Sequence, residues 1–205
     1  MNKYFNGYKR KDGSVGIRNK LLIISITGLT GPTSRKISSF LQGSLFVDNP
    51  YGGGVIGDDN LRQENAIIGF CKNPNIAAVL IISADPPKGN FIKSKLKKLE
   101  KPVSLLTLDE CNHDGIKLFE KGLRAGAKLI KEISNYRREK VSLKKLIIGL
   151  ECGRSDPSSG IISNPIMGLV SDKLVYLGGS VILGETIEWL GAEHLLIKRA
   201  VSNKI

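Results

Sequence analysis

Short apolar, β-branched runs alternate along this chain with segments that have helical spacing. Runs of strand length occupy residues 20–27, 44–48, 76–83, 103–108, 145–150 and 180–183. Helical patterns follow them at residues 32–41, 58–71, 88–101, 113–139, 165–177 and 192–201. The run at 76–83 is apolar on both faces, which is typical of a parallel sheet covered on both sides. The pattern predicts an α/β fold with a mostly parallel, Rossmann-like sheet and helices on both faces.

A basic polar stretch, NYRREKVSLKK, separates the first four predicted strands from the last two. We expect a domain boundary there, near residues 139–143. The first domain then covers residues 1–140. Residues 141–205 hold only two strands, so they are expected to form the start of a second, incomplete α/β domain.

The composition is that of a folded globular protein, with 205 residues of which 41% are hydrophobic and 24% charged. No apolar run approaches the ~18 residues that span a bilayer, and the first residues lack a signal-peptide core. Three widely spaced cysteines do not suggest a disulfide framework. We therefore expect a cytoplasmic protein with no membrane partner.

The formal net charge of +12 raises the question of a nucleic-acid partner. The densest basic stretch, at residues 88–101, has the pattern of a helix with lysines on its solvated face. Aromatic residues make up only 6% of the chain, and no zinc-finger, RRM or KH pattern is present. A small acidic ligand is therefore expected rather than nucleic acid.

Ligands of open parallel sheets bind outside the carboxyl ends of the strands. In this chain that rule selects the polar loops at residues 27–33, 50–59, 83–90, 109–114, 151–160 and 184–193.

Two segments in the first quarter of the chain are consistent with either a binding role or a purely structural role. Arg18 and Asn19 precede the first predicted strand, where they either anchor a carboxylate or serve only the structure. Gly52 and Gly54 belong to a glycine-rich loop that forms either an anion or sugar-acid site or a plain turn. Its spacing is neither that of a Walker A loop nor that of GxGxxG, and Asp58 or Asp59 is expected to cap the helix that follows.

The later loops contain most of the side chains that are suited to metal binding or acid–base chemistry. Glu110 lies in the run DECNHD, which either ligates a metal or caps a helix. Cys152 is a nucleophile, a metal ligand or a packed thiol, and Arg154 nearby offers a fork for a carboxylate. Glu185 and His194 belong to a stretch of three glutamates and one histidine that suits acid–base or metal chemistry.

Six segments in order resemble the altronate dehydratase/galactarate dehydratase family of sugar-acid lyases, to which sulfolactate sulfo-lyase is also similar. They are GYKRKDGSVGIRN, NPYGGGVIGDD, NPNIAAVLII, LLTLDECNHDGIKLFEKGL, LECGRSDPSSGIISNPIMGLVSD and GGSVILGETIEWLGAEHLL. They cover nearly the whole chain. The second segment has Asn49 and Gly53 where the family usually has histidine and cysteine, and a family cysteine is absent near Pro86.

The resemblance implies a lyase of sugar-acid catabolism that eliminates water from a hexonate or hexarate such as altronate, giving a 2-keto-3-deoxy acid. It implies a divalent metal, commonly iron, and a family chain that continues well beyond His194. The roles it implies are Glu185 and His194 as catalytic groups, Glu110 and Cys152 as metal ligands, and Arg18, Asn19, Gly52, Gly54, Arg154, Ser155 and Asp156 as substrate-binding residues.

Two other classes stay open. The first is a non-catalytic or partner-dependent relative that keeps the fold and an anion-binding surface. In that case a second subunit completes the C-terminal domain. The second class is a nucleotide-binding protein, which the missing fingerprint glycines disfavour. A homo-oligomer is also expected.

Overall fold

The computed structural model describes residues 3–51 and 54–202. The chain divides into two compact units. The N-terminal unit is Asn6–Lys140, and the C-terminal unit is Val141–Ile205 together with Met1–Phe5. Each unit is described by itself below.

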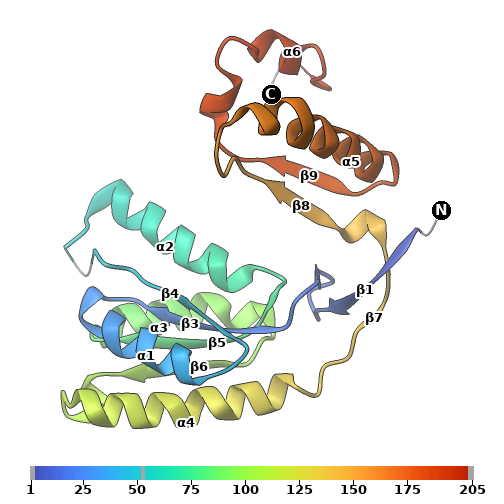
Figure 1. The fold of residues 1–205 in the computed structure, drawn as a ribbon. Helices are drawn as coiled ribbons and strands as arrows, with labels where there is room; N and C mark the ends of the chain where they lie inside the picture. The colour runs from blue at the N-terminus through green and yellow to red at the C-terminus, as the bar shows by residue number, and fades with distance from the viewer. Residues whose placement is uncertain (1–2, 52–53, 203–205) are drawn as a thin grey trace. The chain divides into compact units, whose positions relative to one another are not determined.

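A four-stranded parallel sheet forms the centre of the N-terminal unit (Figure 1). Its strands are β3 (Lys20–Ser25), β4 (Ser44–Val47), β5 (Ile76–Ser83) and β6 (Val103–Thr107), in the order β4-β3-β5-β6. All eight residues of β5 are buried, because apolar side chains leave this central strand on both faces. The parallel α/β sheet predicted from the sequence is confirmed.

Helices cover both faces of this sheet. One apolar cluster joins β3 and β5 to α1 (Gly31–Phe40) and α4 (Gly115–Ile133). The other joins the same strands to α2 (Gly57–Lys72) and α3 (Pro86–Leu96). Gly122 and Gly126 let α4 approach α1, since a Cβ atom there would overlap the side chains of Ile37 and Leu41. Single-turn helices η1 (Gly28–Thr30), η2 (Lys97–Leu99) and η3 (Asp109–Cys111) lie between these elements.

Three short strands were not predicted: β1 (Tyr4–Lys9), β2 (Val15–Gly16) and β7 (Glu139–Ser142), which form a small sheet in the order β2-β1-β7. Their sequences, YFNGYK, VG and EKVS, are short and show no regular apolar alternation, so they gave no strand signal. The long helix predicted at 113–139 ends instead at Ile133. The predicted cap of α2 was also wrong: Ile56 occupies that position, and Asp58 and Asp59 lie in the first turn.

The C-terminal unit has a two-stranded parallel sheet of β8 (Ile147–Leu150) and β9 (Ser180–Leu183). The chain passes from β8 to β9 through η5 (Ser159–Ser163) and α5 (Asn164–Tyr176). The turn η4 (Leu143–Lys145) precedes this sheet, and η6 (Thr186–Trp189) and α6 (Glu193–Ile197) follow it. In the described part of the chain, no helix is long and apolar enough to cross a membrane.

Candidate functional site

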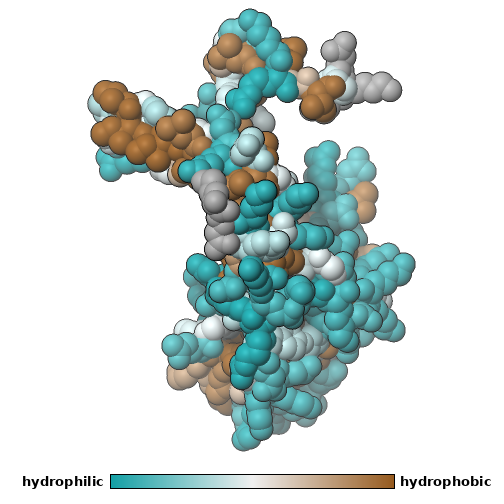
Figure 2. All heavy atoms as spheres, turned by 90° about the vertical axis from the view of Figure 1, so that its right-hand side faces the viewer, coloured by the Kyte–Doolittle hydropathy of each residue, from teal (hydrophilic) through white to brown (hydrophobic). Residues whose placement is uncertain are grey.

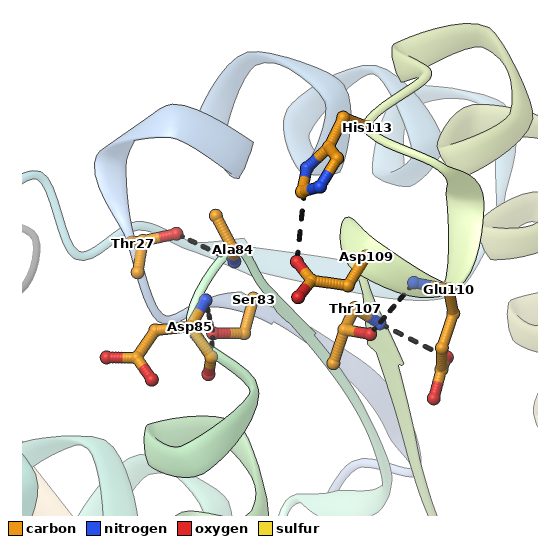
Figure 3. Close-up of polar contacts among 8 residues, drawn as sticks. All are labelled: Thr27, Ser83, Ala84, Asp85, Thr107, Asp109, Glu110 and His113. Atoms are coloured by element: carbon orange, nitrogen blue, oxygen red, sulfur yellow. Dashed lines mark hydrogen bonds and ion pairs between the residues drawn. The ribbon is translucent and has the colours of Figure 1, made fainter.

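Polar residues follow three neighbouring strands of the N-terminal unit at their carboxyl ends (Figure 3). The chain leaves β3 toward β4 on one side and reaches β5 on the other, so the strand order reverses between β3 and β5. At this point the Thr27 hydroxyl accepts a hydrogen bond from the Ala84 amide at 3.1 Å. Asp85 accepts from the Lys88 amide at 3.0 Å and caps α3. These hydrogen bonds join the loops that follow β3 and β5 and cap α3.

Glu110 lies in the turn that follows β6. Its Oε2 accepts from the Thr107 amide at 3.3 Å, and its own amide donates to the Thr107 hydroxyl at 3.3 Å. Among the described residues, no group of three convergent metal-binding side chains includes Glu110. The metal-ligand role of Glu110 therefore stays a prediction. In the structure, its carboxylate makes a local hydrogen bond to the Thr107 amide.

His113 follows Glu110 by three residues and points toward Asp109, with Nδ1 4.0 Å from the Asp109 Oδ1 (Figure 3). Asn112 and His113 both have left-handed backbone angles, with φ of 55° and 57°. The helix α4 begins after them, and Asp114 caps it by accepting from the amides of Ile116 and Lys117. These amide bonds lower the pKa of Asp114.

The glycine-rich loop after β4 is anchored by Asn49. Its side-chain amide donates to the Ile26 carbonyl at 2.7 Å and its Oδ1 accepts from Gln63 Nε2 at 2.7 Å. The Gln63 Oε1 in turn accepts from Lys88 Nζ at 2.9 Å. Both polar atoms of buried Asn49 are therefore occupied by protein. Gly52 lies outside the described residues, and the space around Gly54 is open.

A pocket of about 550 Å³ lies between the end of β4 and α2. Its lining is mostly apolar, from Val47 to Phe70, with Asp48, Asp59 and Arg62 as charged members. The Asp48 Oδ1 is buried without a hydrogen-bond partner, and it lies against Gly31 at the start of α1. A helix N-terminus stabilises a nearby carboxylate, so this placement has a structural explanation.

Arg18 and Asn19 precede β3 and lie at the amino edge of the sheet, opposite the strand-end loops. Asn19 accepts from Arg10 Nη1 at 3.0 Å and donates to the Ile133 carbonyl at 2.8 Å. The exposed Arg18 donates to the carbonyl of its neighbour Ile17. The structure thus does not bring this pair to the other predicted substrate residues of the N-terminal unit, and their binding role stays a prediction.

The C-terminal unit brings together the donor groups that the sequence only placed in separate loops. The strands β8 and β9 are parallel and Leu150 pairs with Leu183, so their carboxyl ends lie side by side. Cys152 and Glu185 each follow by two residues, and Glu188 follows in η6. One ligand atom from each of these three residues lies within 4.8 Å of the others. We call Cys152, Glu185 and Glu188 the strand-end triad.

Exposure and backbone geometry define the triad further. All three side chains are exposed. Glu185 has a left-handed backbone with φ of 52°, an uncommon conformation for a residue with a side chain. The Glu188 amide donates to the Glu185 carbonyl at 3.0 Å, which holds the two glutamates in one turn. Glu188 was not selected from the sequence, although its i+3 spacing from Glu185 was a usable signal.

The other predicted residues of this unit surround the triad in sequence but do not join it. The Ser155 hydroxyl lies 3.9 Å from the Cys152 Sγ. Asp156 accepts from the Ser158 hydroxyl at 2.6 Å and from the Ser159 amide at 2.9 Å, and these bonds lower its pKa. Arg154 and His194 are exposed, and neither is part of the convergent group.

The donor set fits a divalent metal. One thiolate and two carboxylates suit a cation of borderline softness such as iron or zinc better than magnesium, which prefers oxygen alone. Three protein ligands also leave a coordination position for water or substrate, as in catalytic zinc sites. The triad is thus the one group among the described residues that fits the metal expected from the sequence.

Comparison with known proteins identifies the family of both units. Residues 7–134 match the second domain of the D-galactarate dehydratase/altronate hydrolase family, and residues 143–205 match the C-terminal domain of D-galactarate/altronate dehydratases. The chain belongs to this family. The resemblance inferred from the six sequence segments is therefore confirmed.

Three relatives in this family show how much of a longer protein the chain represents. The sulfolactate sulfo-lyase subunit beta of Chromohalobacter salexigens is 29% identical over 98% of this chain and 51% of its own length. The altronate dehydratase of Bacillus subtilis is 30% identical over 100% of this chain and 43% of its own. That of Escherichia coli is 31% identical over 93% and 40%. The chain spans about half or less of these relatives.

Proposed function

We propose that this chain is part of a sugar-acid dehydratase that eliminates water from a hexonate or hexarate such as altronate. The family match over both units supports the reaction class. The observation that carries the proposal is the strand-end triad, because it joins metal-binding groups at the edge where α/β sheets bind ligands.

The reaction sets the chemical demands. A base removes the proton from the carbon next to the carboxylate, the electron pair forms a carbon–carbon double bond, and the β-hydroxyl leaves with a proton as water. The resulting enol then becomes the 2-keto-3-deoxy acid. Such a step needs a cationic group at the carboxylate, stabilisation of the enediolate and a base that titrates near neutral pH.

The side chains of the C-terminal unit meet these demands in the following way. Cys152, Glu185 and Glu188 would hold the divalent metal, which supplies Lewis-acid stabilisation of negative charge when bound. Arg154 follows Cys152 in the same loop and binds a substrate carboxylate through its planar guanidinium. His194 carries the proton as the acid–base group.

Metal analysis tests the ligand assignment. Purified chain is dialysed against iron(II) or zinc and its bound metal measured. Because each variant removes one donor, Cys152→Ser and Glu188→Gln should each lower the bound metal by about tenfold or more. Glu151→Gln is the matched control, since Glu151 adjoins Cys152 but is not part of the triad. Equal metal content in all four proteins would refute the assignment.

The substrate proposal is tested separately by a screen of hexonates, hexarates and sulfolactate for 2-keto product or sulfite. We propose that the chain works with a second polypeptide, because one of the relatives that it matches is a beta subunit. The screen is therefore run with the chain in its native assembly. Absence of product from every acid in the presence of metal would contradict the dehydratase proposal.

A non-catalytic subunit is the second candidate. It is favoured by Asn49, which stands in the loop where the resemblance places histidine and whose two polar atoms are bound by Ile26 and Gln63. In that case the chain binds a sugar acid but shows no turnover. Replacing Arg154 should then abolish this binding.

A further inference from the structure

Two exposed arginines converge at the amino edge of the sheet in the N-terminal unit. Arg18 precedes β3, and Arg138 lies between the end of α4 and the start of β7. The Arg138 Nη2 donates to the Ile17 carbonyl at 3.1 Å, and the Arg18 Nη1 donates to the same oxygen at 3.3 Å. Because the two bonds share one acceptor, the two nitrogens lie no further apart than the sum of these distances. We call Arg18 and Arg138 the arginine pair.

An aromatic ring of the small sheet supports this pair. The Arg138 Cζ lies 5.1 Å from the centre of the Tyr8 ring in β1, and the Cζ of buried Arg10 lies 5.6 Å from the same ring. Arg10 also donates to the Arg18 carbonyl at 3.0 Å. Contact with an aromatic ring and a bond to the backbone restrict the orientations of a guanidinium. Arg138 is therefore held toward Arg18 before any ligand binds.

The positive charge of the arginine pair is not offset by the described carboxylates. The ion pairs among the described residues involve other basic side chains. Glu139, which follows Arg138, pairs with Lys9 at 2.7 Å. Asp12 accepts from the amide and the hydroxyl of Ser14 in its own turn. Two like charges that lie this close repel each other, so an anion between them is favoured.

The arginine pair also keeps most of its hydrogen-bond donors for a ligand. A guanidinium has five N–H donors, and the hydrogen bonds between described residues use one of them in Arg18 and one in Arg138. Both residues are exposed. The side of the N-terminal unit where α4 ends and β1 lies faces the viewer in Figure 2, and its visible surface is mostly hydrophilic. A small anion can thus reach the pair from solvent.

We infer that the arginine pair is a binding site for a phosphate dianion, supplied either as free phosphate or as the phosphate group of a small ester. Guanidinium forks match phosphate oxygens in geometry. A phosphate group carries close to two negative charges near neutral pH, so a single group offsets both arginines. One carboxylate offsets only one of the two charges. The site goes beyond the proposed function, since neither arginine belongs to the strand-end triad.

A bound phosphate would join two segments that are far apart in the chain. Arg18 lies within residues 7–134, which match the second domain of the family. Arg138 lies between this match and the one that begins at residue 143. The segment that connects the two matched domains therefore supplies half of the site, and the ligand would hold this segment at the amino edge of the sheet.

Nuclear magnetic resonance of the arginine side chains tests the site. The full chain of 205 residues is titrated with inorganic phosphate, with glycerol 2-phosphate and with acetate, at constant ionic strength because salt screens exposed charges. The side-chain N–H signals of Arg18 and Arg138 should shift saturably with phosphate, and acetate should bind about tenfold more weakly or less. Shifts with inorganic phosphate alone would assign the site to free phosphate, and shifts with both phosphates would extend it to small esters.

Three matched variants make the test specific. Arg18→Gln and Arg138→Gln should each weaken phosphate binding by about tenfold or more, because each leaves a single guanidinium at the site. Arg137→Gln is the control, since Arg137 is also exposed and adjoins Arg138 but donates to the Ser134 carbonyl instead. Its affinity for phosphate should stay within about twofold of the unchanged chain. Far-ultraviolet circular dichroism checks that each variant keeps the fold.

Three results would overturn the inference: no saturable shift with phosphate, acetate binding as tight as phosphate binding, or equal losses in Arg137→Gln and Arg138→Gln. The last result would assign the effect to the general positive charge of this surface. The metal content of the strand-end triad and the turnover of sugar acids are measured separately, so failure of the phosphate site leaves the dehydratase proposal intact.

Discussion

Replacing Arg10 with methionine should destabilise the N-terminal unit strongly. The Arg10 side chain is only 8% exposed, and burial lowers its pKa. Its guanidinium donates to the Pro74 carbonyl at 2.8 Å, to the Arg18 carbonyl at 3.0 Å and to the Asn19 Oδ1 at 3.0 Å. It thereby ties the amino edge of β3 to the turn before β5.

The magnitude follows from these three bonds. Hydrogen bonds from a charged donor contribute about 1.5–3 kcal/mol each, and methionine leaves the three acceptors without this partner. Part of this loss is offset because a buried guanidinium no longer has to be desolvated. We expect a net loss of about 3 kcal/mol in the free energy of unfolding.

Urea unfolding followed by far-ultraviolet circular dichroism measures the loss. With an m-value of about 2 kcal/mol/M, the midpoint should fall by about 1.5 M. Arg18→Met is the matched control. Arg18 is exposed, and its change should stay within about 0.5 kcal/mol. Equal midpoints for the two variants would refute the assigned role of Arg10, which is to stabilise the fold through its three hydrogen bonds.

Three further predictions follow from the described contacts. Alkylation of the native chain should modify exposed Cys152 but neither Cys71 nor Cys111, because both of these are buried and burial raises the pKa of the Cys71 thiol to about 12. Peptide mass spectrometry measures which cysteines are modified. Labelling of Cys71 as early as Cys152 would contradict the prediction. Gly16→Ala should lower the free energy of unfolding in urea by about 2 kcal/mol or more, since the added Cβ would overlap the Pro74 carbonyl. Gly69→Ala, on the open surface of α2, should raise it by about 0.5–1 kcal/mol. A change of the same sign in both variants would be inconsistent with this packing. Hydrogen bonds from backbone amides lower the pKa of Asp114 in the folded chain, so its contribution to stability is present above pH 3.8 and is lost as the pH falls through the folded-state pKa. Asp114→Asn keeps the helix cap without the charge and should lose less stability than the unchanged chain between pH 4 and pH 2. Identical acid unfolding of the two proteins would argue against this role of the carboxylate.

The periodicity of the sequence was sufficient to predict the central strands and the helices between them. Strand β5 illustrates why, since its seven consecutive apolar residues have few alternatives to a buried strand. The same signal failed for β1, β2 and β7. These strands are short and lack apolar alternation, and pairing with other segments stabilises them rather than any local pattern.

The candidate site was predicted in part. Cys152 and Glu185 were selected because each follows a predicted strand, and the structure brings them together. Glu188 was missed, and the metal role of Glu110 received no support from a neighbouring ligand. The residues of a site come from loops that are far apart in the chain, so their convergence depends on strand order and register.

The sequence by itself determined the fold class, the order of the elements and the position of polar loops after apolar strands, because these properties depend on residues within a few positions of one another. Only the tertiary structure decided which of those loops meet. The parallel register of β8 and β9 brings Cys152 to Glu185, although 33 residues separate them. The same structure assigns Asn19 to a bond with Arg10 at the amino edge of the sheet. Such contacts depend on long-range pairing, which local periodicity does not encode.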